Sequence, residues 1–201
     1  MDENPKINSV TLRGVTSCAP VFSHESRGAR FYSFPIEVER LSGAVDSLNV
    51  IARQELLSCT DLTEGDKLGV YGELRSFNNR SGIGSRLIIS VFARSIEMET
   101  GEDRNLVELT GTLCKAPTLR TTPMGREICD LMLAVNRRYG RSDYLPCIAW
   151  GLLAHSASAW RVGDRIALHG RIQSRQYIKL IDGEQMEKTA FEVSVTDAAR
   201  V

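Results

Sequence analysis

Hydrophobic and polar residues alternate along most of the second half of the chain, which is the pattern of half-buried β-strands. This pattern predicts strands at 106–113, 127–137, 143–151, 165–181 and 188–198. Residues 152–164 have helical spacing instead. Gly170 lies within the long fourth segment, where a glycine favours a bend at which a sheet closes on itself. The pattern therefore predicts five strands with one helix between the third and the fourth.

The first half of the chain repeats the second. Residues 10–20, VTLRGVTSCAP, align with residues 107–117, VELTGTLCKAP, and the offset of 97 continues without a gap to residue 53. One inserted residue then moves the offset to 98, at which residues 64–76 align with residues 162–174. Self-similarity of this kind indicates a duplicated structural unit.

Two domains of the same architecture follow from the duplication, residues 1–98 and residues 105–201. The polar stretch METGEDRN, 98–105, is predicted to be a short linker between them. Five strands, one of them strongly bent, with a single helix are the layout of the OB-fold. The predicted fold class is all-β, with two tandem five-stranded OB-fold barrels that each carry one helix between the third and fourth strands.

Alternate residues of a strand point to opposite faces, so their parity distinguishes the inside of a barrel from the outside. Within 143–151, the small apolar residues suited to an interior are Leu145, Cys147 and Ala149. The residues predicted to face outward there are Tyr144, Ile148 and Trp150. Within 165–181, the inward set is Ile166, Leu168 and Ile172. The outward set is Arg171, Gln173, Arg175, Tyr177 and Lys179.

Charge is unevenly distributed, although the net charge of the 201 residues is zero. Residues 112–181 contain 11 basic and 4 acidic residues, a net of +7, whereas residues 15–83 contain 7 and 9, a net of −2. A basic stripe in one half indicates a polyanionic partner for that half. Unpaired bases stack on aromatic rings and phosphates attract cations, so single-stranded nucleic acid suits this face. Both RNA and DNA meet these requirements, so the sequence is compatible with either partner.

Several other classes of protein find little support. No apolar run approaches the roughly 20 residues that span a bilayer, and the N-terminus MDENPKINS lacks the pattern of a signal peptide. The five cysteines are odd in number and have no CxxC spacing, so they indicate reduced thiols rather than a metal site or disulfide framework. No catalytic triad or phosphate-binding GxxxxGK is evident. We expect a cytoplasmic binding protein that is not an enzyme and has no cofactor.

Residues 105–201 resemble the bacterial single-stranded DNA-binding protein family. Three stretches carry the resemblance: LTGTLCKAPTLRTTPMGREICDLMLAVNR, YLPCIAWGLLA and VGDRIALHGRIQSRQY. Residues 7–98 resemble the same family more faintly. The resemblance implies an OB-fold protein that binds single-stranded DNA without sequence preference and protects it in replication, recombination or repair.

The resemblance also implies where DNA would bind. In the family, aromatic side chains on the outer face of the barrel stack with bases, and the corresponding positions here hold Tyr139, Tyr144, Trp150 and Tyr177. The neighbouring cations expected to meet phosphates are Arg137, Arg138, Arg141, Arg171, Arg175 and Lys179. The alternative interpretation is that the rings cover apolar surface or a subunit interface.

The first repeat lacks aromatic residues at the four equivalent positions, which hold Ser42, Ser47, Arg53 and Asn79. Its expected interior positions remain apolar: Phe34, Ile36, Val38, Leu48, Val50 and Ala52. We therefore expect the second repeat to bind DNA and the first to serve structure and assembly. Two-barrel members of the family reach four barrels as dimers, so the resemblance implies a homodimer.

The family usually continues past the barrel into a flexible tail whose acidic tip recruits other proteins. This sequence ends with VTDAARV after the last predicted strand. That ending favours an accessory role, for instance in a plasmid, phage or mobile element. It also favours the alternative function of a primosome-type scaffold that acts mainly through other proteins. The resemblance implies a bacterial cytoplasmic location, associated with the nucleoid.

Overall fold

The computed structural model describes residues 7–58, 60–79, 87–137, 140–181 and 184–201. Packing divides the chain into two compact units. The N-terminal unit comprises residues 9–75 and 89–106, and the C-terminal unit comprises residues 1–8, 76–88 and 107–201. Strands form most of the described chain, as the alternation of polar and apolar residues predicts.

The N-terminal unit is built on the strands of the first repeat. In chain order its elements are β1 (Asn8–Thr16), β2 (Val21–Ser26), β3 (Ala29–Glu39), β4 (Val45–Arg53), α1 (Gln54–Leu57), β5 (Lys67–Asn78) and β6 (Leu87–Met98). Strand β1 pairs with both β3 and β5, β3 pairs with β4, and β4 runs parallel to β6, which adjoins β5. The five long strands therefore close into a barrel, and β2 is added at the edge of β3.

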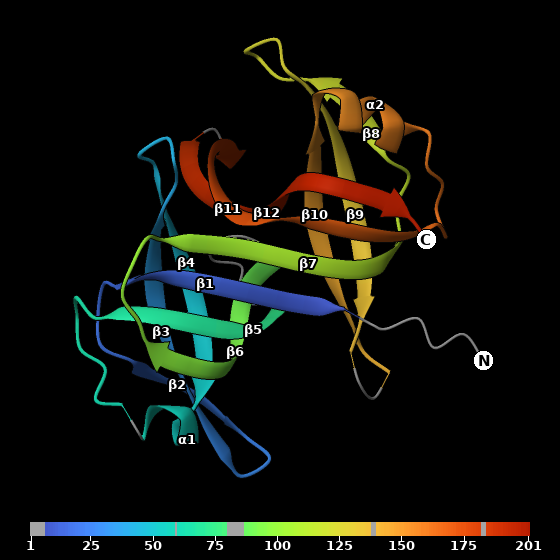
Figure 1. The fold of residues 1–201 in the computed structure, drawn as a ribbon. Helices are drawn as coiled ribbons and strands as arrows, with labels where there is room; N and C mark the ends of the chain where they lie inside the picture. Colours follow the sequence, from blue (N-terminus) through green and yellow to red (C-terminus); the bar gives the residue numbers. More distant parts are fainter. Residues whose placement is uncertain (1–6, 59, 80–86, 138–139, 182–183) are drawn as a thin grey trace. The chain divides into compact units, whose positions relative to one another are not determined.

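The C-terminal unit has the same order of elements. They are β7 (Arg104–Leu113), β8 (Thr118–Thr121), β9 (Glu127–Asn136), β10 (Ser142–Trp150), α2 (Gly151–Ser158), β11 (Arg165–Ile181) and β12 (Glu184–Arg200). Strand β7 pairs with β9 and β11, β9 with β10, and β10 runs parallel to β12, which pairs with β11. Figure 1 shows α2 at one end of β9 and β10, beside β8.

The predicted five strands and single helix are present in each unit, with one short strand in addition. The extra strands, β2 and β8, each form a hairpin with the strand that follows. Gly28 and Gly125 occupy these two turns with φ of 74° and 76°, a conformation that glycine adopts without steric cost. This explains why the glycine occurs in both repeats. Neither helix of the described chain is long and apolar enough to cross a membrane.

The predicted interior residues form the cores of the two barrels. In the C-terminal unit the buried set includes Leu145, Cys147, Ala149, Ile166, Leu168 and Ile172. In the N-terminal unit it includes Phe34, Ile36, Val38, Leu48, Val50 and Ala52. Parity therefore assigned the inner faces of these strands correctly.

Gly170 marks the predicted bend in β11. The register of β11 against β12 shifts between His169 and Gly170, which is the geometry of a β-bulge. A Cβ atom at Gly170 would collide with the carbonyl oxygen of Ser194. The glycine is therefore required because two backbones approach closely where the barrel closes.

The polar stretch between the repeats is bonded to the N-terminal unit. Glu99 accepts hydrogen bonds from Arg13 and from the hydroxyl of Tyr71. Asp103 forms an ion pair with Lys67, with 2.6 Å between Nζ and Oδ1, and accepts a bond from the backbone N–H of Glu39. The predicted linker is thus bonded to one barrel through Glu99 and Asp103, and it is shorter than predicted because β6 ends at Met98 and β7 begins at Arg104.

Candidate nucleic-acid interface

Strand β10 presents two aromatic rings on the outside of the C-terminal barrel. Tyr144 is 50% exposed and Trp150 is partly exposed, while the intervening Leu145, Cys147 and Ala149 are buried in the core. The outward prediction is therefore correct for both rings. Rings of this kind offer flat apolar faces to the solvent side of the sheet.

Ile148 has the parity that predicts an outward side chain, but only 4% of its surface is exposed. Its neighbours in register are Asp130 on β9 and Ser194 on β12. A side chain in the middle of a barrel wall has strands on both sides, so neighbouring side chains shield it even when it points outward. The outer face of β10 therefore includes a buried apolar residue between the rings of Tyr144 and Trp150.

Trp150 is held by a hydrogen bond to the neighbouring strand. Its indole Nε1–H donates to the hydroxyl of Ser194 on β12, with 3.1 Å between the two atoms. Ser194 is itself buried, and Trp150 pairs in register with the buried Ile128 of β9. A ring fixed in this way loses little conformational entropy when another flat group stacks on it.

A polar network crosses β11 and β12 on the same outer face. Gln173 donates from Nε2 to Oε1 of Glu192 at 3.0 Å, and Arg175 donates from Nε to Oε2 of Glu192 at 3.4 Å. Arg171 also contacts the amide oxygen of Gln173. Gln173 points to the predicted face but is only 7% exposed. The facing carboxylate explains this, since the two polar groups satisfy each other.

Glu192 was not among the residues singled out in the sequence. A signal is present in β12, where the polar Glu192 and Ser194 alternate with the buried Val193 and Val195. That alternation places both polar residues on the outer face. It does not predict their burial, which depends on the residues of β10 and β11.

Arg137, expected to meet phosphate, already has a carboxylate partner. Its Nε lies 2.7 Å from Oδ2 of the fully buried Asp143, and its guanidinium lies 5.5 Å from the ring centre of Phe77. The first repeat has the same pair, with 2.6 Å between Nε of Arg40 and Oδ2 of Asp46. The shared pair joins the two ends of a hairpin turn, so its presence in both repeats has a structural explanation.

Asp143 also accepts a hydrogen bond from the backbone N–H of Ser76, at 2.6 Å. The hydroxyl of Ser76 in turn accepts from the backbone N–H of Tyr144, at 2.8 Å. Both contacts lie within the C-terminal unit, which includes residues 76–88 at the end of β5 and the start of β6. They fix the backbone from which the Tyr144 ring projects.

The remaining predicted residues differ in how far the structure describes them. Arg141 is exposed in the turn before β10, and Arg175 is about half exposed on β11. Arg138 and Tyr139 lie outside the described residues. Tyr177 and Lys179 lie on β11, but their side chains are not described. The structure thus brings Tyr144, Trp150, Arg171 and Arg175 onto one face of the adjacent strands β10, β12 and β11.

The N-terminal barrel carries a different set of aromatic residues, which the comparison of equivalent positions missed. Phe31 stacks on His24 with ring centres 4.8 Å apart, and Arg53 lies over Phe31 at 5.8 Å. Arg75 and Arg94 lie over Phe92 at 5.8 and 5.2 Å. These ring faces are therefore already covered by groups of the same chain.

The strand register explains how this set arose at shifted positions. Phe92 lies beside Ile51, as Ser194 lies beside Ile148, so Phe92 occupies the place of Ser194. Arg53 occupies the place of Trp150 at the offset of 97. In the C-terminal repeat the ring lies on β10 and the polar residue on β12, whereas in the N-terminal repeat the ring of Phe92 lies on β6 and the polar Arg53 on β4. Arginine side chains cover the ring of Phe92, whereas a serine holds the edge of Trp150.

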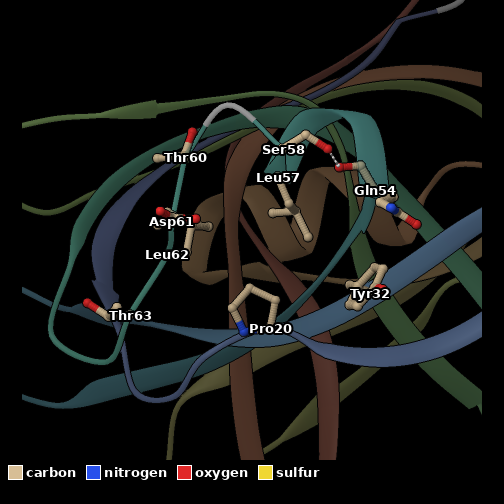
Figure 2. A pocket seen from close by; sticks show the side chains of 9 residues that line it. All are labelled: Pro20, Tyr32, Gln54, Leu57, Ser58, Thr60, Asp61, Leu62 and Thr63. Atoms are coloured by element: carbon tan, nitrogen blue, oxygen red, sulfur yellow. Dashed lines mark hydrogen bonds between the residues drawn. The ribbon is translucent and has the colours of Figure 1, made fainter.

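A pocket of about 310 Å³ opens beside α1 in the N-terminal unit (Figure 2). The described residues that line it are Pro20, Tyr32, Gln54, Leu57, Ser58, Thr60, Asp61, Leu62 and Thr63. This lining has one carboxylate, one aromatic ring and no Lys or Arg. It is poorly suited to a phosphate backbone, which requires cations.

Comparison with known proteins matches the C-terminal repeat to a known family. The Single-strand binding protein family model matches residues 104–200. Single-stranded DNA-binding protein B of Bacillus subtilis is 35% identical over 80 residues, which cover 36% of this chain and 71% of that protein. Single-stranded DNA-binding protein 2 of Listeria innocua is 36% identical over 80 residues, which cover 36% of this chain and 50% of that protein. The chain thus spans about half the length of the latter relative.

A solved structure extends the likeness to both repeats. The wild-type single-stranded DNA binding protein from Thermus aquaticus has a TM-score of 0.78 and 24% identity, covering 98% of this chain and 93% of that one. This likeness establishes the fold, which is two tandem OB-fold barrels. With the family model on the C-terminal repeat and a 35% identical relative matched over 71% of its length, the chain belongs to the single-strand binding protein family.

Proposed function

We propose that the chain binds single-stranded DNA without sequence preference, through the outer face of its C-terminal barrel. One observation carries the proposal: the exposed ring of Tyr144 and the partly exposed ring of Trp150 share a face with Arg171 and Arg175. Bases stack on such rings, and phosphates interact with guanidinium groups. The net charge of +7 over residues 112–181 supports the same partner.

The face suits unpaired strands better than duplex. A duplex buries the flat faces of its bases, whereas an unpaired strand exposes them to stacking. A barrel wall has no projecting helix that could enter a groove and read base edges. Protection of unpaired DNA in replication, recombination or repair follows from such binding, in the bacterial cytoplasm at the nucleoid. Tyr139, Tyr177, Arg138, Arg141 and Lys179 are proposed to extend the same face.

Titration with oligo-dT, followed by tryptophan fluorescence, tests the proposal. A base stacked on Trp150 should quench its emission, and the affinity should fall about tenfold or more between about 50 mM and about 200 mM salt. A Trp160→Phe variant assigns the signal to Trp150 and should retain full affinity. Absence of quenching and of salt dependence would reject nucleic-acid binding at this face. Oligo-rU in parallel shows whether RNA is also bound.

We further propose that the chain forms a homodimer with four barrels, and that the N-terminal barrel contributes mainly to structure and assembly. Its covered rings support the second statement, because a base would have to displace His24, Arg53, Arg75 or Arg94 before it could stack. The resemblance to two-barrel members of the family supports the first. Light scattering at micromolar concentration should give twice the 22.3 kDa chain mass, and a monomer mass would contradict it.

A further inference from the structure

The outer face of the C-terminal barrel contains an acidic residue where a polyanion would lie. Glu192 stands opposite Gln173 in the β11–β12 register and is 4% exposed. Its carboxylate accepts hydrogen bonds from Gln173 and from Arg175. The next residue of β12 on this face is Ser194, which holds Trp150. Glu192 is therefore bonded to a proposed phosphate ligand and lies two residues along β12 from the serine that holds the Trp150 ring.

Neither the core nor the fold accounts for this carboxylate. Val193 and Val195 supply the inward side chains of this part of β12, and the equivalent of Glu192 in the first repeat is Ser90. A serine there is equally buried, and Asn49 donates to it at 3.3 Å. Burying a charge is costly unless it is paired, and a negative charge opposes the approach of phosphate. Here the charge is paired with Gln173 and Arg175, and Arg175 is itself a proposed phosphate ligand.

Within this network, the contact between Arg175 and Glu192 is the one in which another anion could replace the carboxylate. Its length of 3.4 Å exceeds the roughly 2.7–2.9 Å of strong charge-assisted bonds. The Arg175 side chain is about half exposed, whereas the Glu192 side chain is almost fully buried. The guanidinium can therefore turn toward solvent while the carboxylate stays in place beside Gln173.

We propose that Glu192 limits the affinity of the DNA site by holding Arg175 until a strand phosphate takes the place of the carboxylate. This inference rests on the proposed function. Binding then exchanges one oxygen anion for another at Arg175, and dissociation restores the contact with Glu192. Such internal competition favours rapid release, which a protein that covers unpaired DNA needs when the strand is required elsewhere.

The substitution Glu192→Gln tests the proposal while keeping the shape of the side chain. It should bind oligo-dT about tenfold more tightly at low salt, mainly through slower dissociation, because the carboxylate of Glu192 no longer competes with phosphate for Arg175. The slope of log affinity against log salt should stay within about 0.3 of the wild-type value, because Arg175 meets a phosphate in both complexes and the number of phosphate contacts is unchanged. Unchanged or weaker binding would overturn the inference.

A double-mutant cycle separates exchange from general repulsion. In an Arg175→Ala background, Glu192→Gln should change the affinity by less than about twofold, because coupled residues lose their interaction together. A full tenfold gain in that background would show that the carboxylate acts only as a distant charge, and would also overturn the inference. Glu73→Gln is the matched control, since Glu73 pairs with Arg75 and Arg94 on the N-terminal barrel and should leave dT affinity unchanged.

A measurement on the unaltered chain covers the case in which Glu192→Gln does not fold. The NMR signal of the Arg175 Nε–H group, assigned with Arg175→Lys, should shift when oligo-dT is added. No shift while dT binds would reject the exchange. A wild-type chain that fails to bind dT would instead reject the proposed function, so the two failures are distinguishable.

Discussion

At the scale of single residues, the two repeats differ in what covers their aromatic rings. Trp150 is fixed by a hydrogen bond at its edge, from Nε1 to Ser194, and the residue is partly exposed. Phe31 and Phe92 instead lie beneath His24 and arginine side chains. An edge contact orients a ring without using its stacking surface, whereas a contact on its face occupies that surface. The same fold therefore holds a ring by its edge in one repeat and covers ring faces with other side chains in the other.

This difference predicts unequal effects of matched substitutions. Replacing Tyr144 and Trp150 together by alanine should weaken oligo-dT binding by about 1–3 kcal/mol for each base that loses its ring. Replacing Arg53 and Arg75 by alanine should change the affinity by less than about twofold, because a repeat that does not bind contributes little. Fluorescence anisotropy of labelled oligo-dT measures both. Equal losses would contradict the division of labour between the repeats.

At the scale of elements, the wall made by β10, β12 and β11 depends on the close approach of β11 to β12 at Gly170. The bulge there changes the register, so that residues after it, including Gln173 and Arg175, meet Glu192 and Ala190. The side chains of the candidate site are thus arranged by a feature of the backbone.

Gly170→Ala should therefore destabilise the fold as well as weaken DNA binding. The added methyl group meets the carbonyl oxygen of Ser194, and such overpacking typically costs about 1–3 kcal/mol. Gly125→Ala is the comparison, because its turn has open space around the new Cβ and only the left-handed backbone is strained, at about 1 kcal/mol. Thermal unfolding and dT affinity check the prediction. An alanine tolerated at position 170 without loss of either would refute the role of the close approach.

At the scale of the whole molecule, the residues between the barrels are attached to the N-terminal unit rather than free. Glu99 is the main contact, through the hydroxyl of Tyr71 and the guanidinium of Arg13. The hydrogen bond from Tyr71, followed by that from Arg13, lowers the pKa of Glu99 below its ordinary value. The chain therefore leaves the first barrel from a defined point at neutral pH.

A lowered pKa in the folded state makes this attachment dependent on pH. The stabilisation is fully present above the pKa that Glu99 has in the unfolded chain, and it is lost as the pH falls through the lower pKa of the folded state. Glu99→Gln should therefore unfold at lower urea than wild type at neutral pH, and the difference should disappear in acid. Glu55→Gln, at an exposed position of α1, should show no such change. A constant offset at every pH would contradict the ionic attachment.

The sequence by itself determined the duplication, the order of the strands and the inner faces of both barrels. Local alternation suffices for these, since the parity of Leu145, Cys147 and Ala149 is a property of one strand. It also placed Tyr144 and Trp150 on the outer face. The alternation did not predict the short strands β2 and β8, because each is a brief edge strand with no buried residue and hence no alternating pattern.

Only the tertiary structure decided what surrounds the outward residues. Ile148 is buried and Gln173 is paired with Glu192 because neighbouring strands of the barrel lie beside them. The alternation of polar and apolar residues within one strand does not predict which strands become neighbours. The rings of Phe31 and Phe92 meet for the same reason, since they belong to β3 and β6. Which outward side chain is available to a ligand is a property of several strands together, so the fold had to be known first.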